Sequence, residues 1–129
     1  EVGPPIPYHR AIAEMMGSDL LLVFQGSNFN TQIPAKIYEY LRSERPILAV
    51  VDPQGGTAFQ LGRFQAVQIA DIHATATIRT ALLATLDANA SREQAGALAH
   101  NRQLVLSYSR SAQTCSLGQL FDRVACVSP

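Results

Sequence analysis

Short apolar runs alternate along this chain with segments whose apolar residues recur at helical spacing. The runs Leu20–Phe24 and Pro46–Val51 are continuous, which is typical of strands buried in a parallel sheet, whereas Ala66–Ala70 alternates apolar and polar positions like a strand near an edge. Apolar residues three or four positions apart predict helices. The predicted helices run from Tyr8 to Met16, from Pro34 to Arg42, through Phe59 to Leu61, from Thr75 to Ala88, from Ser91 to Leu106 and from about Ser116 onward.

Turn and cap residues set the boundaries of these elements. Glu1–Pro7 is predicted to be the tail of a strand that enters a rigid turn. Its three prolines, Pro4, Pro5 and Pro7, exclude both a helix and strand pairing where they stand. Gly17 is expected to end the first helix. Asp52–Gly56 has the composition of a turn, and Thr57 with Gln60 has the spacing of a capping box.

The alternation of helices and strands predicts an α/β fold with one parallel, Rossmann-like sheet and flanking helices. A chain of 129 residues with 47% hydrophobic content is long enough for one such domain. Ligands of parallel sheets bind outside the carboxyl ends of the strands. We therefore expect the loops after Val2, Phe24 and Val51 to face any ligand.

The segment from Asn30 to Val51 carries the strongest chemical signal. A helix opened by Pro34 would leave the backbone amides of Thr31, Gln32 and Ile33 free at its positive end, and such an end attracts phosphate. Glu39 follows on the same predicted helix, where its carboxylate could accept hydrogen bonds from a sugar hydroxyl. The segment thus predicts a binding site for the diphosphate and ribose of a nucleotide.

The order of the residues in this segment resembles a known pattern. Thr31–Pro34 forms a loop, Lys36–Leu41 (KIYEYL) a helix with a central Glu, Ser43–Arg45 a turn, and Pro46–Ala49 an apolar strand. The pattern is similar to the nucleotide-binding segment of GT-B glycosyltransferases of the family-four type. A Lys three positions before the Glu is similar to bacterial sugar transferases of polysaccharide assembly.

The resemblance implies an enzyme that moves a sugar from a UDP- or GDP-sugar to a saccharide or lipid-linked acceptor. It implies that Glu39 binds the ribose, that Lys36 steadies the diphosphate and that Ile6 supports the base. It also implies that Gly55, Gly56 and Thr57 approach the donor closely. The alternatives are a solvated Glu39 paired with Lys36 or Arg42, a surface Lys36 and plain turns at Ile6 and at 55–57. No catalytic residue, metal ligand or cofactor other than the donor sugar nucleotide is expected.

One position departs from the family pattern. Thr31 stands where family-four enzymes usually have a second Glu near the transferred sugar. The resemblance therefore leaves the donor sugar and the stereochemical outcome open. It also leaves open a degenerate transferase domain that is kept only for assembly.

The resemblance covers only the second half of the GT-B donor-binding domain, with residues 1–129 as a partial C-terminal domain. Val2–Pro4 would end the third strand, and the fourth to sixth strands would follow. The first two strands and the acceptor-binding domain are expected to be missing from this stretch, so it should be inactive alone. The unpaired fourth strand is expected to associate with the missing part or with another copy.

A different class of function remains open. Asp19 or Asp52, near strand ends, could be the phosphorylation site of a flavodoxin-like signalling or interaction domain. Ten acidic and ten basic side chains cancel, so no nucleic-acid partner is expected. Three scattered histidines predict no zinc site, and two cysteines predict no disulfide framework. We expect a cytoplasmic protein, with peripheral attachment at the inner membrane face through the missing domain.

Overall fold

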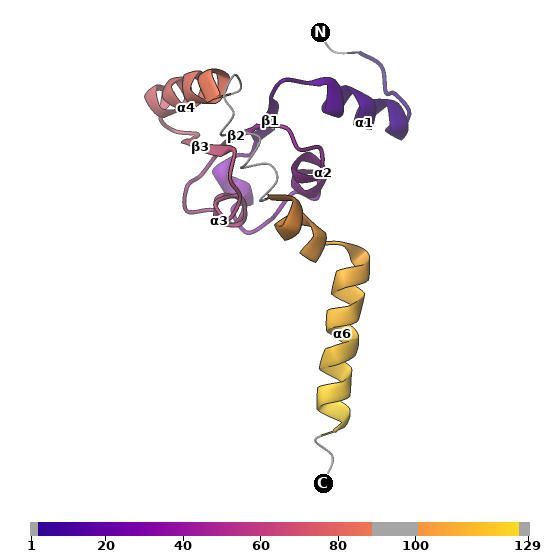
Figure 1. Ribbon diagram of the computed structural model, residues 1–129. Coiled ribbons are helices and arrows are strands. Elements are labelled where there is room, and N and C mark those ends of the chain that lie inside the picture. Colours follow the sequence, from indigo (N-terminus) through magenta and orange to yellow (C-terminus); the bar gives the residue numbers. More distant parts are fainter. Residues whose placement is uncertain (1–2, 89–100, 127–129) are drawn as a thin grey trace.

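The computed structural model describes residues 3–88 and 101–126, and its centre is a three-stranded parallel sheet (Figure 1). The strands are β1 (Leu21–Phe24), β2 (Ile47–Val51) and β3 (Val67–Asp71), in the order β1-β2-β3. Leu21 pairs with Ile47, which in turn pairs with Val67. All five residues of β2 are buried, as expected for a central strand.

Helices cover the sheet on both faces. They are α1 (Tyr8–Gly17), α2 (Lys36–Arg42), α3 (Gly56–Leu61), α4 (Thr75–Ala88) and α6 (Arg110–Ala125), with a short 3-10 turn η1 (Ser27–Phe29) after β1. A further helical segment occupies 101–107. Figure 1 shows α4 over one face of the sheet and α2 and α3 over the other, while α6 projects away from the body.

Two apolar clusters hold these layers together. The larger one joins the buried side chains of α2 and α3, such as Ile37 and Leu61, to those of β1 and β2. The smaller one packs Leu48, Val50 and Ala70 against α4. The described part of the chain is therefore an α/β structure with an open parallel sheet between helices, as the alternation of elements predicts.

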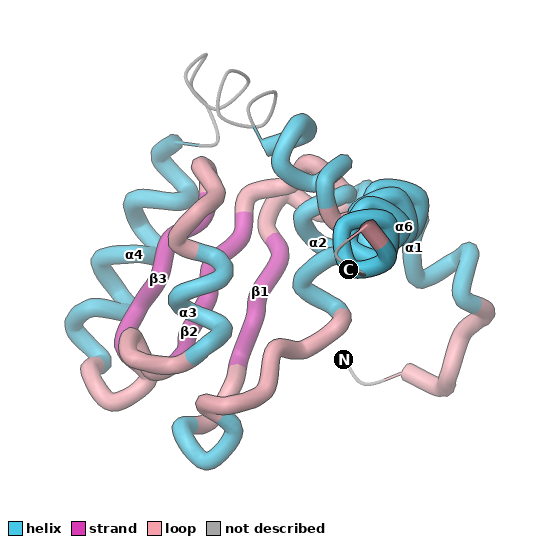
Figure 2. The backbone as a smooth tube through the Cα atoms, turned by 90° about the horizontal axis from the view of Figure 1, so that it is seen from below, coloured by secondary structure: helices cyan, strands magenta, loops and turns pink. Residues whose placement is uncertain are grey.

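Among the described residues, no strand pairs with the outer side of β1. The backbone amides of Leu21 and Gln25 donate to the carbonyls of Pro46 and Val50, so the backbone groups of the alternate residues Leu22 and Phe24 face the outer edge of the sheet. The side chains of Leu22 and Phe24 are 55% and 70% exposed. Figure 2 shows β1 as the last strand on this side of the sheet. The open edge lies where the resemblance places a neighbouring strand.

Several predicted boundaries are wrong by a few residues. Helix α2 begins at Lys36 and not at Pro34, because Pro34 and Ala35 form a tight turn whose carbonyls accept from the amides of Ile37 and Tyr38. The capping box at Thr57 is absent, since the N-cap of α3 is Gly55 and Thr57 lies inside the helix. Helix α6 begins at Arg110, six positions before the predicted Ser116.

Other predictions fall partly outside the described residues. Val2 is not described, and residues 3–7 are irregular, so the predicted strand tail is not seen in the described part. The predicted start of a helix at Ser91 also lies outside the described residues, although 101–107 is helical as expected. No helix in the described ranges is long and apolar enough to cross a membrane.

Candidate functional site

The loops after the strands meet at the carboxyl edge of the sheet and bond to one another. Asn30, in the loop after β1, donates from Nδ2 to Asp52 Oδ2 at 2.7 Å, and its carbonyl accepts from the Gly56 amide at 2.8 Å. The loop after β3 joins through His73, whose Nε2 lies 2.7 Å from Ser27 Oγ. These contacts fix the loops relative to the strand tips.

The Gln32 carbonyl is a second point of attachment. It accepts from Gln25 Nε2 at 3.0 Å and from Thr57 Oγ1 at 3.2 Å. The Gln32 amide donates to the Phe29 carbonyl at 2.9 Å, so the expectation that this amide is free is wrong. Within the described residues, the amides of Thr31 and Ile33 have no hydrogen-bond partner. Two of the three amides that were predicted to be free therefore are free in the described structure.

The glycines after β2 serve loop packing. A Cβ at Gly55 would lie 2.9 Å from Asn30 Oδ1, and one at Gly56 would lie 3.1 Å from the Asn30 carbonyl oxygen. Thr57 is only 1% exposed and its hydroxyl is engaged by Gln32. Residues 55–57 thus begin α3 and pack closely against the loop after β1.

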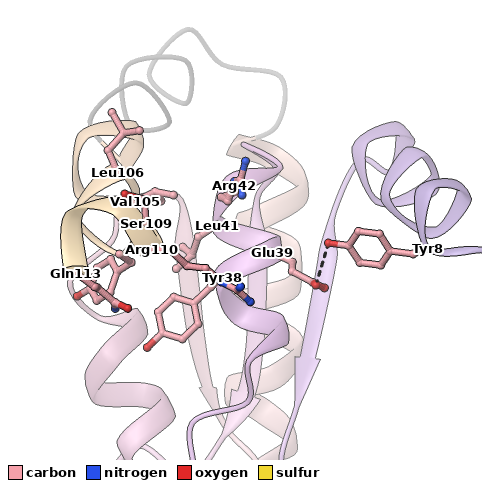
Figure 3. Close-up of a pocket in the computed structure, with 11 residues that line it drawn as sticks. Tyr8, Tyr38, Glu39, Leu41, Arg42, Val105, Leu106, Ser109, Arg110 and Gln113 are labelled. Atoms are coloured by element: carbon pink, nitrogen blue, oxygen red, sulfur yellow. Dashed lines mark hydrogen bonds between the residues drawn. The ribbon is translucent and has the colours of Figure 1, made fainter. Parts of the chain in front are cut away.

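Lys36 and Glu39 lie together on α2. Ile37 and Leu41 bury the inner side of this helix, so Glu39, about half a turn away, faces outward. Its Oε1 accepts from the Tyr8 hydroxyl of α1 at 3.3 Å (Figure 3). A cavity of about 490 Å³ between α1 and α2 is lined by both Lys36 and Glu39 as well as Tyr8.

The predicted site residues thus fall into two groups. Lys36 and Glu39 share the cavity beside α1. The bonded loops contain Thr31, Gln32, Ile33 and residues 55–57, which line neither this cavity nor a second one, of about 590 Å³, between α2 and α6. Ile6 is 40% exposed on the segment before α1 and lines neither cavity. The Glu39 carboxylate faces α1 and not the strand tips. A ligand that contacts both groups would have to extend along the start of α2.

Tyr8 is a candidate site residue that the sequence did not indicate. It lies 31 positions before Glu39, and no local pattern connects the two. Its side chain is 69% exposed, so its hydroxyl meets Glu39 at the mouth of the cavity. Only the placement of α1 beside α2 reveals the contact.

Asp52 is the most heavily bonded carboxylate at the strand tips. Its Oδ2 accepts from Asn30 and its Oδ1 from the Gln54 amide at 2.9 Å. The Asn30 side chain, followed by the Gln54 amide, lowers the pKa of Asp52, and Ser27 and His73 act in the same direction. Because both oxygens already have protein donors, the geometry does not favour Asp52 as a phosphate acceptor.

The architecture defines an open, parallel α/β domain with a loop cluster at the strand tips and cavities beside α2. In residues 3–88 and 101–126, no group of three or more metal-ligating side chains is found. Comparison with protein-family models, with curated proteins and with solved structures finds no match for this chain.

Proposed function

We propose that this chain is the donor-binding part of a GT-B glycosyltransferase, which moves a sugar from a nucleotide diphosphate sugar to a saccharide or lipid-linked acceptor. The proposal rests on the order of residues from Thr31 to Ala49. The supporting observation in three dimensions is that Lys36 and Glu39 line one cavity. In the whole protein, two further strands and an acceptor-binding domain would complete the site.

The chemistry of the cavity suits a ribose with an attached phosphate. Glu39 is an acceptor for two vicinal hydroxyls, and its present donor, the Tyr8 hydroxyl, is of the same chemical type. Lys36, one turn closer to the helix start, supplies a positive charge for phosphate. The exposed amides of Thr31 and Ile33 lie further toward the same end. As the glycosidic bond breaks, these donors would stabilise the charge that develops on the leaving diphosphate.

A titration with UDP and GDP, followed by calorimetry, tests the ribose contact. Removing a negative charge should strengthen the binding of any anion, so Glu39→Gln would bind more tightly if Glu39 were only nearby. A ribose contact predicts the opposite. We expect Glu39→Gln to weaken binding by roughly 10-fold or more, as for the loss of a hydrogen bond to a charged group.

Asp122→Asn is the matched control, because Asp122 is exposed on the projecting helix α6. It removes the same charge and should leave the affinity unchanged. Wild-type protein that binds neither nucleotide, or Glu39→Gln that binds more tightly than wild type, would overturn the proposal. If the chain joined to its upstream domain binds nucleotide but neither transfers nor hydrolyses any sugar nucleotide, the degenerate-domain alternative replaces it.

A further inference from the structure

The Tyr8 hydroxyl is bonded to the carboxylate on which the proposed ribose contact depends. It donates to Glu39 Oε1 at 3.3 Å, and both side chains line the cavity of about 490 Å³ between α1 and α2. Figure 3 shows the Glu39 carboxylate turned toward Tyr8 and away from Tyr38 and Arg110. A ligand hydroxyl that reaches Glu39 in this cavity therefore lies next to the Tyr8 hydroxyl.

The bonded pair of Tyr8 and Glu39 can still accept further hydrogen bonds. A carboxylate accepts at both of its oxygens, and within the described residues no second donor bonds to the Glu39 carboxylate. A phenolic hydroxyl that donates its proton can also accept through its oxygen. Donation to a carboxylate polarises the hydroxyl and makes that oxygen a better acceptor. Glu39 and Tyr8 thus offer two adjacent acceptors.

A vicinal diol is the chemical complement of two adjacent acceptors. The 2′- and 3′-hydroxyls of a ribose lie on the same face of the ring, and each has one proton to donate. One hydroxyl can donate to Glu39 while the other donates to Tyr8, so that both protons find an acceptor. A 2′-deoxyribose lacks one of these hydroxyls and leaves one acceptor without a partner.

The surroundings of Tyr8 leave room for the rest of a nucleotide. The Tyr8 side chain is 69% exposed, so a ligand can reach its hydroxyl. Lys36, one turn before Glu39, lines the same cavity and would face the phosphate. Tyr8 follows Ile6 by two positions, which limits their Cα separation to about 7 Å. A ribose between Tyr8 and Glu39 therefore keeps its base within reach of the segment to which the resemblance assigns it.

We propose that Tyr8 determines specificity for the pentose: while bonded to Glu39, it accepts a hydrogen bond from the second ribose hydroxyl and so selects ribonucleotides over deoxyribonucleotides. This inference rests on the proposed function, because it takes Glu39 as the ribose contact. It narrows the donor to sugars carried by ribonucleoside diphosphates such as UDP and GDP. Thymidine diphosphate sugars, whose pentose lacks the 2′-hydroxyl, are excluded.

Nuclear magnetic resonance titrations with UDP, 2′-deoxy-UDP and 3′-deoxy-UDP test the inference, because they detect weak as well as tight binding. Wild-type protein should bind each deoxynucleotide roughly 3- to 10-fold more weakly than UDP, as for the loss of one hydrogen bond. Tyr8→Phe, an exposed change that leaves the fold intact, should weaken UDP binding by a similar factor. It should also lose the discrimination against one deoxynucleotide, the one without the hydroxyl that Tyr8 binds, and keep the discrimination against the other.

Tyr38→Phe removes the same group from the residue before Glu39 and is the control. It should change nothing, because Tyr38 does not line the cavity beside α1. If Tyr8→Phe binds UDP more tightly than wild type, Tyr8 competes with the ribose for Glu39 and the inference is overturned. Discrimination by Tyr8→Phe that is unchanged for both deoxynucleotides, or lost for both, would also overturn it. These results leave the proposed function intact, whereas wild-type protein that binds no UDP would remove the proposed function itself.

Discussion

Ala66 has a backbone conformation that L-residues adopt at a cost. Its φ is 55°, and among the described residues the same value occurs at Glu44, in the turn before β2. The left-handed region brings Cβ close to the following carbonyl oxygen, which a glycine avoids. The Ala66 carbonyl accepts from the Ile47 amide at 3.1 Å, so the neighbouring strands hold the residue in place.

We therefore predict that Ala66→Gly stabilises the fold. The relief of strain exceeds the extra entropy that glycine has in the unfolded chain, for a net gain of roughly 0.5–1 kcal/mol. Urea unfolding measures the change. Ala70→Gly is the control, because Ala70 lies in β3, is 1% exposed and should lose stability. Equal effects at both positions would contradict the strain argument.

Asp52 should make stability depend on pH in the acid range. Its pKa is lowered in the folded chain from the ordinary value of 3.8, first by the Asn30 side chain and then by the Gln54 amide. The unfolded chain then binds the proton more readily, so the stabilisation is complete above the ordinary pKa and is lost as the pH falls below it. We predict that the stability difference between wild type and Asp52→Asn narrows below about pH 4. Urea unfolding between pH 6 and pH 3 measures it, and a constant difference would contradict the prediction.

At the scale of elements, the sequence predicts the unit from α2 to β2 well and its first turn poorly. Continuous apolar runs predict β1 and β2, whereas the alternation of apolar and polar positions predicts β3. The start of α2 depends on whether Pro34 takes the first helical position or precedes it. Local sequence does not distinguish these cases. In the structure, Gln25 and Thr57 hold the Gln32 carbonyl in the loop before Pro34, and α2 begins after Pro34.

Two unlike contacts attach the segment 101–107 to the turns before β3 and β2. Asn101, 4% exposed, accepts from the Gln65 amide at 2.8 Å and donates to the Gln65 carbonyl at 2.5 Å. Arg102 pairs with Glu44 through two bonds of 2.7 Å, with the Arg102 side chain 65% exposed. Solvent weakens the exposed ion pair, whereas a buried backbone group left without a partner is costly.

We predict that Asn101→Ala costs roughly 1–3 kcal/mol and Arg102→Gln less than about 1 kcal/mol. Tyr108 follows this segment, and its ring lies 5.4 Å from that of Tyr38. Detachment of segment 101–107 would therefore also alter this ring contact. Urea unfolding gives the two losses, and hydrogen exchange in 101–107 shows whether the segment is released. A larger loss from Arg102→Gln would reverse the ranking.

For the whole molecule, the outer side of β1 is one of the two edges of the sheet that pair with no further strand in the described residues, the other being that of β3. Its backbone groups and the side chains of Leu22 and Phe24 form an edge that can accept another strand. We predict that the chain self-associates with concentration and that Leu22→Lys reduces the association. Sedimentation velocity over a concentration series measures it.

Leu83→Lys on α4 is the control, since Leu83 is 50% exposed but lies away from the β1 edge. An equal effect of both substitutions would indicate nonspecific hydrophobic association and not pairing at the β1 edge. A chain that stays monomeric at every concentration would contradict the prediction.

Which residues meet at the cavities could be predicted only in part. Lys36 and Glu39 are three positions apart, so helical spacing alone brings them to one side of α2. Tyr8 of α1 bonds to Glu39, and Arg110 of α6 lines a cavity with it; both placements depend on how helices far apart in the sequence pack together. Sequence spacing carries no information of that kind.

The close approach of Gly55 to Asn30 has a consequence for how this chain can evolve. A side chain at position 55 becomes acceptable only after position 30 has become smaller, because a Cβ there would lie 2.9 Å from Asn30 Oδ1. Shrinking position 30 first, however, removes the bond to Asp52. Either order passes through a less stable intermediate. Homologous chains should therefore keep this Asn and Gly as a pair or have exchanged both.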